Sequence, residues 1–149
     1  MRIGELCTRD VVFCRRDTSA VGVADLMRKG HVGDLLVIDE LDGERVPVGI
    51  ITDRDLVIEV MAKEIDPRDV TAGDIMGREL AVATEDEDFY ETIQRMRAKG
   101  IRRMPVVNAR GGLVGIATLD DLVEFLAETL GDVSRISRRQ EVKERSARG

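Results

Sequence analysis

The sequence predicts an α/β (α+β) protein built from two pseudo-symmetric strand–helix–strand–strand–helix units packed face to face. Two observations lead to this fold class. The stretch Ile3–Asp39 aligns with Ala72–Asn108 at a constant shift of 69 positions, and Gly49–Asp55 aligns with Gly115–Asp121 at a shift of 66. Within each copy, short apolar runs alternate with segments whose apolar residues recur at helical spacing. A unit of this size buries little surface alone, so we expect the copies to pack together and to leave a cleft between them.

Composition narrows the class of protein further. The 149 residues are 43% hydrophobic but only 3% aromatic, and the net charge is −6. We therefore expect an aliphatic core, few stacking platforms for nucleic-acid bases, and no polyanion-binding body. Arg2, Glu5 and Arg9 interrupt the start, and no apolar run approaches membrane-spanning length. Cys7 and Cys14 make no disulfide framework, so the expectation is a cytoplasmic protein with reduced thiols.

In the first copy, the ends of the elements carry recognisable signals. Acidic and hydroxyl side chains suit a helix start, glycine suits a helix end, and Asp-Gly suits a hairpin turn. The expected elements are a strand at Val11–Phe13, a helix between Asp17 and Gly30, strands at Leu35–Ile38 and Val46–Ile51 around Asp42-Gly43, and a helix from Asp53.

The second copy repeats this order and ends in a different kind of segment. Its expected elements are a strand at Leu80–Val82, a helix between Glu85 and Gly100, strands at Met104–Val107 and Leu113–Ala117 around Gly111-Gly112, and a helix from Leu119. Because Pro67 cannot continue a helix, we place the domains at 1–67 and 68–131. Residues 132–149 form a polar tail with six basic and three acidic side chains. This tail is either a polar helix extension or disordered.

Each copy closes on a similar motif, Gly-Ile-Ile-Thr-Asp-Arg-Asp in the first and Gly-Ile-Ala-Thr-Leu-Asp-Asp in the second. Each motif follows a hairpin whose first strand reads Leu-Leu-Val-Ile-Asp or Met-Pro-Val-Val-Asn. Over residues 2–130 the chain resembles a tandem pair of cystathionine-β-synthase (CBS) domains, also called a Bateman module. This resemblance implies that the strand-to-helix junctions line the cleft and bind adenosine-type ligands, and that the chain is a regulatory module.

The residue chemistry of these junctions supports a nucleoside site. Thr52 and Asp55, like Thr118 and Asp121, lie three positions apart where a strand becomes a helix. Asp can accept hydrogen bonds from two ribose hydroxyls, Thr can bond a phosphate or the sugar, and free N–H groups at a helix start favour an anion. The alternative is that each Thr and Asp only cap their helix, and the two roles can coexist.

The two sites are expected to differ in charge. Arg102 and Arg103 precede a strand, and the resemblance places them near phosphates in the site of Thr118 and Asp121. Their counterparts in the first copy are Gly33 and Asp34, and a carboxylate repels phosphate. The Asp121 site is therefore expected to be the better nucleotide site. The Asp55 site would be empty, hold an uncharged nucleoside, or borrow Arg102; alternatively the arginines pair with surface carboxylates.

The resemblance also places the adenine near Cys7, Asp10 and Val12 for the Asp121 site. We expect no metal site, since the spacing of Cys7, Cys14 and His31 fits no zinc pattern. With one histidine, the chain offers no recognisable catalytic set, so an enzyme ranks last.

The predicted function is sensing of an adenine nucleotide or related adenosyl compound, with no resident cofactor. CBS pairs often act on an effector domain, so the resemblance implies a separate effector protein, and a homodimer that covers Leu56, Val60, Leu122 and Leu126. One alternative is a structural dimerisation module without a physiological ligand. Another is a weak nucleic-acid binder that uses the basic tail. No membrane partner is expected.

Overall fold

The computed structural model describes residues 1–149, and the order of its elements follows the predicted repeat. The first strand of each copy lies further along the chain than expected, at Phe13–Arg15 instead of Val11–Phe13 and at Ala83–Thr84 instead of Leu80–Val82. The first half contains α1 (Ile3–Leu6), β1 (Phe13–Arg15), α2 (Ala20–Gly30), β2 (Asp34–Leu41), β3 (Glu44–Thr52), α3 (Asp53–Leu56) and the π-helical turn η1 (Val57–Met61). The second half contains α4 (Ala72–Ile75), β4 (Ala83–Thr84), α5 (Phe89–Lys99), β5 (Arg103–Val107), β6 (Leu113–Thr118) and α6 (Leu119–Arg148).

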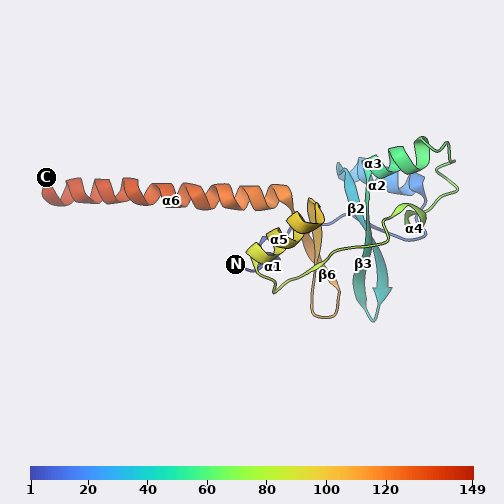
Figure 1. Cartoon of the computed structure of the whole chain (residues 1–149), viewed down its shortest axis with the longest axis horizontal. Helices are drawn as coiled ribbons and strands as arrows, with labels where there is room; N and C mark the ends of the chain where they lie inside the picture. The colour runs from blue at the N-terminus through green and yellow to red at the C-terminus, as the bar shows by residue number, and fades with distance from the viewer.

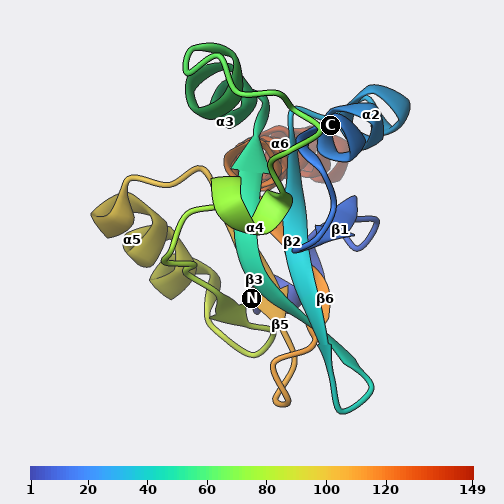
Figure 2. The same ribbon diagram turned by 90° about the vertical axis from the view of Figure 1, so that its right-hand side faces the viewer.

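Each half forms one mixed three-stranded sheet. The strand orders are β1-β2-β3 and β4-β5-β6, with the first pair parallel and the second antiparallel in both sheets. A register shift interrupts β2 at Val37/Ile38 and β5 at Val106/Val107. Figure 2 shows β2, β3, β5 and β6 running together through the centre of the molecule, where β3 contacts β6. The predicted α+β fold of two similar units is confirmed.

The short helices α1 and α4, which the sequence did not predict, are exchanged between the halves. Ile3 N–H donates to the Glu87 carbonyl at 2.9 Å, and Phe89 N–H donates to the Met1 carbonyl at 2.9 Å. In the other direction, Ala72 N–H donates to the Thr18 carbonyl at 2.7 Å. A four-residue helix has no stability of its own, so each is held by the unit on which it packs. The two halves are therefore tied together at both ends.

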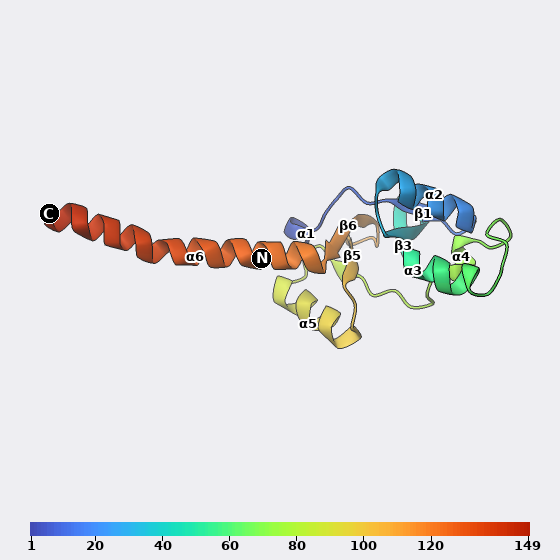
Figure 3. The same cartoon turned by 90° about the horizontal axis from the view of Figure 1, so that it is seen from above.

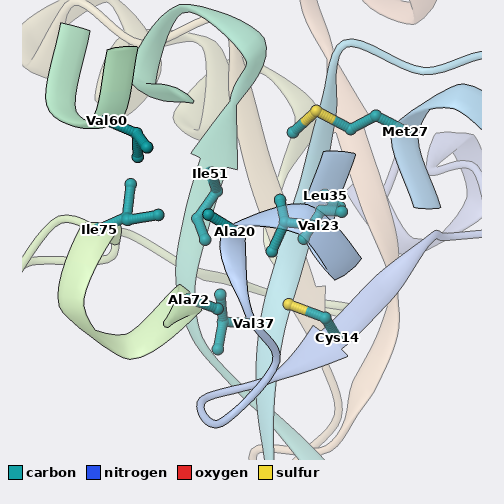
Figure 4. Close-up of a cluster of buried hydrophobic side chains, with 10 residues drawn as sticks. All are labelled: Cys14, Ala20, Val23, Met27, Leu35, Val37, Ile51, Val60, Ala72 and Ile75. Atoms are coloured by element: carbon teal, nitrogen blue, oxygen red, sulfur yellow. The ribbon is translucent and has the colours of Figure 1, made fainter. Parts of the chain in front are cut away.

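Three aliphatic clusters form the core. The first lies between the β1-β2-β3 sheet and its helices, and Figure 4 shows Ala72 and Ile75 of α4 pointing into it. The second packs under the β4-β5-β6 sheet and includes Ile3 and Cys7 from the start of the chain. The third joins the sheets through buried residues that come from both halves, namely Leu36, Ile38 and Ile116. Burial of these surfaces is the main force that holds the halves together.

The helix ends differ slightly from the expectation. Gly30 is the last residue of α2, and His31 takes the left-handed conformation with φ 51°. In α5 the equivalent position is Gly100, with φ 63°, as predicted. The helix ends at Gly30 as expected, but the left-handed position that follows falls on His31, which is the residue aligned with Gly100.

Helix α6 is 30 residues long and leaves the body of the molecule. Figures 1 and 3 show its C-terminal part projecting as a single helix, far from both sheets. Of the two alternatives for the tail, the structure has the helical one. Leu122 is its only buried residue, and Phe125 packs edge-to-face on Phe89 with ring centroids 5.2 Å apart. No helix combines the length and apolar character that crossing a bilayer requires.

Two residues expected to lie in a dimer interface are core residues. Val60 is 3% exposed and Leu122 is 4% exposed in the single chain. They pack against the first and second clusters respectively, so neither needs a partner chain to cover it. The expectation that they mark an interface was wrong, because apolar spacing on a helix does not say which neighbour covers the apolar face.

Candidate functional site

Two grooves lie where the halves of the chain meet. The Thr52 groove has a volume of about 490 Å³. Its lining residues are Ile50, Thr52, Glu79, Leu80, Ala81, Lys99, Ile101, Arg102 and Arg103. The Thr118 groove is smaller, about 190 Å³. Its lining residues are Thr8, Asp10, Val11, Val12, Val32, Asp34, Leu35, Leu36, Ile116, Thr118 and Asp121.

The two grooves are equivalents of each other under the repeat. Ile50 and Thr52 of one groove correspond to Ile116 and Thr118 of the other. The remaining walls also correspond, with Glu79 in the place of Asp10, Ile101 in that of Val32, and Arg103 in that of Asp34. Each groove thus takes its strand end from one half and its other wall from the opposite half. A ligand in either groove would contact both halves.

The Thr and Asp of each motif form a capping box. Thr52 N–H donates to Asp55 Oδ2 at 2.8 Å, and Asp55 N–H donates to Thr52 Oγ1 at 3.2 Å. The second box repeats this, with Thr118 N–H donating to Asp121 Oδ2 at 3.2 Å and Asp121 N–H donating to Thr118 Oγ1 at 3.2 Å. The alternative role as helix caps is therefore present. In both boxes Asp Oδ1 receives no donor from the protein and is free to accept one from a ligand.

The grooves carry opposite charge. Lys99, Arg102 and Arg103 line the Thr52 groove against one carboxylate, Glu79. The Thr118 groove is lined by three carboxylates and no cationic side chain, the carboxylates being Asp10, Asp34 and Asp121. Grooves of the same backbone design therefore attract opposite ligand charges.

This arrangement corrects the expected position of the arginines. Arg102 and Arg103 line the groove of Thr52, not that of Thr118 and Asp121. Their backbone does run beside Thr118, since Arg103 pairs with Thr118 in the β5-β6 register and Leu119 N–H bonds the Arg102 carbonyl at 2.8 Å. The side chains nevertheless serve the other groove, because each groove combines opposite halves of the chain.

An ion pair joins a lining residue of one groove to a lining residue of the other. Arg103 Nε lies 2.9 Å from Asp34 Oδ1, and these two residues occupy equivalent positions in the repeat. The Asp34 side chain is 17% exposed and that of Arg103 is 38% exposed. Burial raises the pKa of Asp34; Arg103 opposes this shift and the nearby Asp53 carboxylate adds to it. Desolvation outweighs the attraction of Arg103 in setting the pKa of Asp34, because the carboxylate is the more buried partner.

The other predicted ligand-binding residues differ in how deeply they are buried and in whether they line a groove. Asp10 and Val12 line the Thr118 groove with Asp121, so the structure brings these three together. Cys7 lies in the second core cluster, 8% exposed, and burial raises its pKa. Asp55 is not among the residues that line the Thr52 groove; it forms the capping box with Thr52 and is half-buried. No group of three or more His, Cys, Asp or Glu side chains is arranged to hold a metal ion.

Sequence reasoning missed Lys99 and Glu79 as groove residues. A signal for Glu79 existed, since it aligns with the candidate Asp10 at the shift of 69. Lys99 ends α5 and reaches the groove only through the packing of that helix on the other half. Nothing in its sequence context distinguishes it from a solvated lysine at a helix C-terminus.

Comparison with known families decides what the repeat is. The model of the CBS domain matches the chain twice, over residues 3–62 and 72–128. The chain belongs to the CBS domain family. These matches cover both units of the tandem CBS pair and confirm the resemblance seen in the sequence.

Relatives of this CBS pair include proteins of similar length. YlbB of Bacillus subtilis is 34% identical over 147 residues, which span 94% of this chain and 96% of that protein. An uncharacterized protein of Methanopyrus kandleri is 38% identical over 122 residues, or 82% of this chain. That alignment covers only 61% of the Methanopyrus protein, which is therefore longer than the region it shares with this CBS pair.

Solved structures of other CBS proteins show the same fold. Hypoxic Response Protein I, solved with two coordinated zinc ions, superposes with a TM-score of 0.73 at 26% identity, covering 83% of this chain and 98% of that one. The cytosolic domain of the Mg²⁺ channel MgtE, solved with ATP, superposes with a TM-score of 0.70 at 26% identity, covering 83% of this chain and 48% of that one. The CBS pair of protein MJ0100, solved with 5′-methylthioadenosine and S-adenosyl-L-methionine, superposes with a TM-score of 0.71 at 24% identity. The superposition covers 85% of this chain and 99% of that one.

Proposed function

We propose that this CBS pair is a regulatory, non-catalytic module that binds an adenine nucleotide in the Thr52 groove. The observation that carries the proposal is the meeting of Lys99, Arg102 and Arg103 with Thr52 in one groove. Guanidinium groups bind phosphate oxygens in bidentate fashion, and the ammonium adds a further positive charge. Other CBS proteins have been solved with ATP and with adenosyl compounds, which supports the ligand class.

The Asp55 carboxylate completes the recognition of the nucleoside. Its Oδ2 is held by the Thr52 amide, so its position is fixed before a ligand arrives. Its Oδ1 can accept from a ribose hydroxyl, while the apolar side chains of Ile50, Leu80 and Ile101 offer a surface for the base.

The Thr118 groove suits a different charge. Its three carboxylates repel phosphate, so it would take an uncharged or cationic adenosyl compound. This reverses the sequence-based expectation that the Asp121 site is the better nucleotide site. Because each groove spans both halves, a ligand that fits one relative orientation of the halves better would shift the population toward it. That shift is the signal a separate effector protein would sense.

Isothermal titration calorimetry with ATP and with adenosine tests the proposal. Asp55→Ala should lower the affinity for both ligands at least tenfold, because a hydrogen bond to a charged acceptor contributes about 1.5–3 kcal/mol. Arg102→Ala should weaken ATP and spare adenosine. Asp121→Ala should change ATP affinity less than Asp55→Ala does.

Two matched variants control for indirect effects. Asp74→Ala removes the same kind of capping box from α4, where Thr71 N–H donates to Asp74 Oδ2 at 3.0 Å, outside both grooves. Arg110→Ala removes a guanidinium that is 81% exposed and lies outside both grooves. Both should bind ATP as the unaltered chain does. Absence of heat with ATP, AMP, adenosine and S-adenosylmethionine would contradict the proposal and favour the module without a ligand.

A further inference from the structure

The Arg103–Asp34 ion pair takes one side chain from each groove. Asp34 begins β2 beside Thr52, yet its side chain lines the Thr118 groove. Arg103 begins β5 beside Thr118, yet its side chain lines the Thr52 groove. The two side chains meet with Arg103 Nε 2.9 Å from Asp34 Oδ1. A ligand that attracts either side chain therefore changes the charge that the other groove presents.

Among the cations of the Thr52 groove, Arg103 is the one that a carboxylate of the protein already holds. Lys99 and Arg102 line the same groove and form no ion pair, so they are available to a ligand from the start. A phosphate bound there gains a further bidentate partner if it takes Arg103 from Asp34. The Arg103 side chain is long and 38% exposed, so it can turn toward a phosphate while its backbone stays in β5.

Loss of Arg103 leaves Asp34 in an unfavourable place for a lone carboxylate. Its side chain is 17% exposed, and both burial and the nearby Asp53 carboxylate raise its pKa. The two other carboxylates of the Thr118 groove add negative charge, and no cationic side chain lines that groove. Removing one partner of a largely buried ion pair is destabilising because the remaining charge is uncompensated. A positively charged group of a ligand in the Thr118 groove would supply the missing charge.

We propose that the two grooves bind unlike ligands cooperatively: a phosphate in the Thr52 groove raises the affinity of the Thr118 groove for an adenosyl compound that carries a positive charge. This coupling rests on the proposed function, since it takes the nucleotide of the Thr52 groove as given. Coupling between two sites is reciprocal, so the cation raises the affinity for the nucleotide by the same factor. A second phosphate is disfavoured in the Thr118 groove, because the freed Asp34 carboxylate repels it. The module would therefore respond to two ligands of opposite charge together.

Isothermal titration calorimetry in both directions tests the coupling in the full chain at neutral pH. ATP is titrated into the chain alone and into the chain saturated with S-adenosylmethionine, which carries a net positive charge, and the reverse titration follows. Each ligand should bind at least about fivefold more tightly when the other is present, the lower end of typical coupling between two sites. 5′-Methylthioadenosine shares the adenosyl group but carries no charge, so it should leave the affinity for ATP unchanged.

Variants of the ion pair assign the coupling to its two side chains. Asp34→Asn should abolish the effect of S-adenosylmethionine on the affinity for ATP. Asp39→Asn is the matched control and should keep the effect, because Asp39 lies on the same strand and pairs with Arg16 outside both grooves. Arg103→Gln should bind S-adenosylmethionine more tightly than the unaltered chain does in the absence of ATP, because its Asp34 is unpaired from the start. A merely structural role of the ion pair would not produce that gain.

The outcomes separate this coupling from the proposed function on which it rests. ATP binding that S-adenosylmethionine leaves unchanged would overturn the coupling while the nucleotide groove stands. Coupling that survives in Asp34→Asn would overturn it as well, since another contact would then connect the grooves. Weaker ATP binding in the presence of S-adenosylmethionine would show that both ligands compete for one groove, which also overturns it. A chain that binds no ATP at all would contradict the proposed function itself and remove the coupling with it.

Discussion

The Arg103–Asp34 pair connects the two grooves at the scale of single residues. Arg103 is one of the two arginines that line the Thr52 groove, and Asp34 is one of the carboxylates that line the Thr118 groove. Their 2.9 Å contact means that Arg103 cannot serve a phosphate fully while it is held by Asp34. A phosphate in one groove therefore competes with a carboxylate of the other.

Asp34→Asn should tighten ATP binding several-fold by releasing Arg103 to the phosphate, and should leave adenosine binding unchanged. Asp39→Asn, which removes a carboxylate that pairs with Arg16 outside both grooves, is the control. Calorimetry at neutral pH measures both. Weaker ATP binding by Asp34→Asn would show that Asp34 orients Arg103 for the phosphate instead of withholding it.

Because the pKa of Asp34 is raised, the release of Arg103 from Asp34 should depend on pH. Burial raises this pKa above the ordinary value of 3.8, so protonation begins at a higher pH than for a free carboxyl. As pH falls through the raised pKa, Asp34 becomes neutral and Arg103 is released. The folded state also binds the Asp34 proton more tightly than the unfolded chain does. Protonation of Asp34 therefore contributes to the free energy of unfolding below pH 3.8, and this contribution is lost as pH rises through the pKa of the folded state. The gain in ATP affinity on acidification should be smaller in Asp34→Asn than in the unaltered chain, as measured by calorimetry across that range.

At the scale of elements, the strands β3 and β6 approach their neighbours through equivalent glycines. A Cβ on Gly115 would lie 2.5 Å from the Thr8 backbone oxygen, whereas one on Gly49 would lie 2.6 Å from Met76 Sδ. Thr8 is fixed by two backbone hydrogen bonds to Ile116, both 2.9 Å long. The obstacle is thus rigid at one glycine and a flexible thioether at the other.

Gly115→Ala should destabilise the protein by roughly 1–3 kcal/mol, the cost of overpacking a core, and Gly49→Ala should cost less. Urea unfolding of the two variants compares them directly. Equal losses would mean that the Thr8 segment moves as easily as the Met76 side chain.

The projecting part of α6 should be dispensable for ligand binding. Residues 132–149 lie outside both grooves, and from Gly131 onward the helix contributes no core residue. A chain ending at 131 should bind ATP with unchanged affinity in calorimetry. A large loss of affinity on truncation would show that the tail acts on the grooves.

At the scale of the whole molecule, the exchange of α1 and α4 ties the repeats into one unit. The start of the chain completes the second core, and the start of the second repeat completes the first. A cut between the sequence repeats therefore removes Ala72 and Ile75 from the core to which they belong.

A fragment of residues 10–77 should be more structured than one of residues 1–67, although the second is the unit of the sequence repeat. The fragment of residues 10–77 keeps α4, which packs in the first core, and lacks α1, which packs in the second core. Far-UV circular dichroism and thermal unfolding compare the two. Equal stability of the fragments, or stability equal to that of the full chain, would show that α4 contributes nothing to the first unit.

The sequence by itself determined the features that depend on neighbouring residues. The repeat, the succession of strands and helices within each unit, the Asp42-Gly43 turn and the Thr-Asp junctions all follow from local periodicity, turn chemistry and capping. Only the tertiary structure decided which half covers which: the exchange of α1 and α4, the burial of Val60 and Leu122, and the assignment of Arg102 and Arg103 to the Thr52 groove. These depend on contacts between residues that are far apart in the chain, and a pseudo-symmetric repeat offers each side chain two equivalent neighbours that the linear pattern does not distinguish.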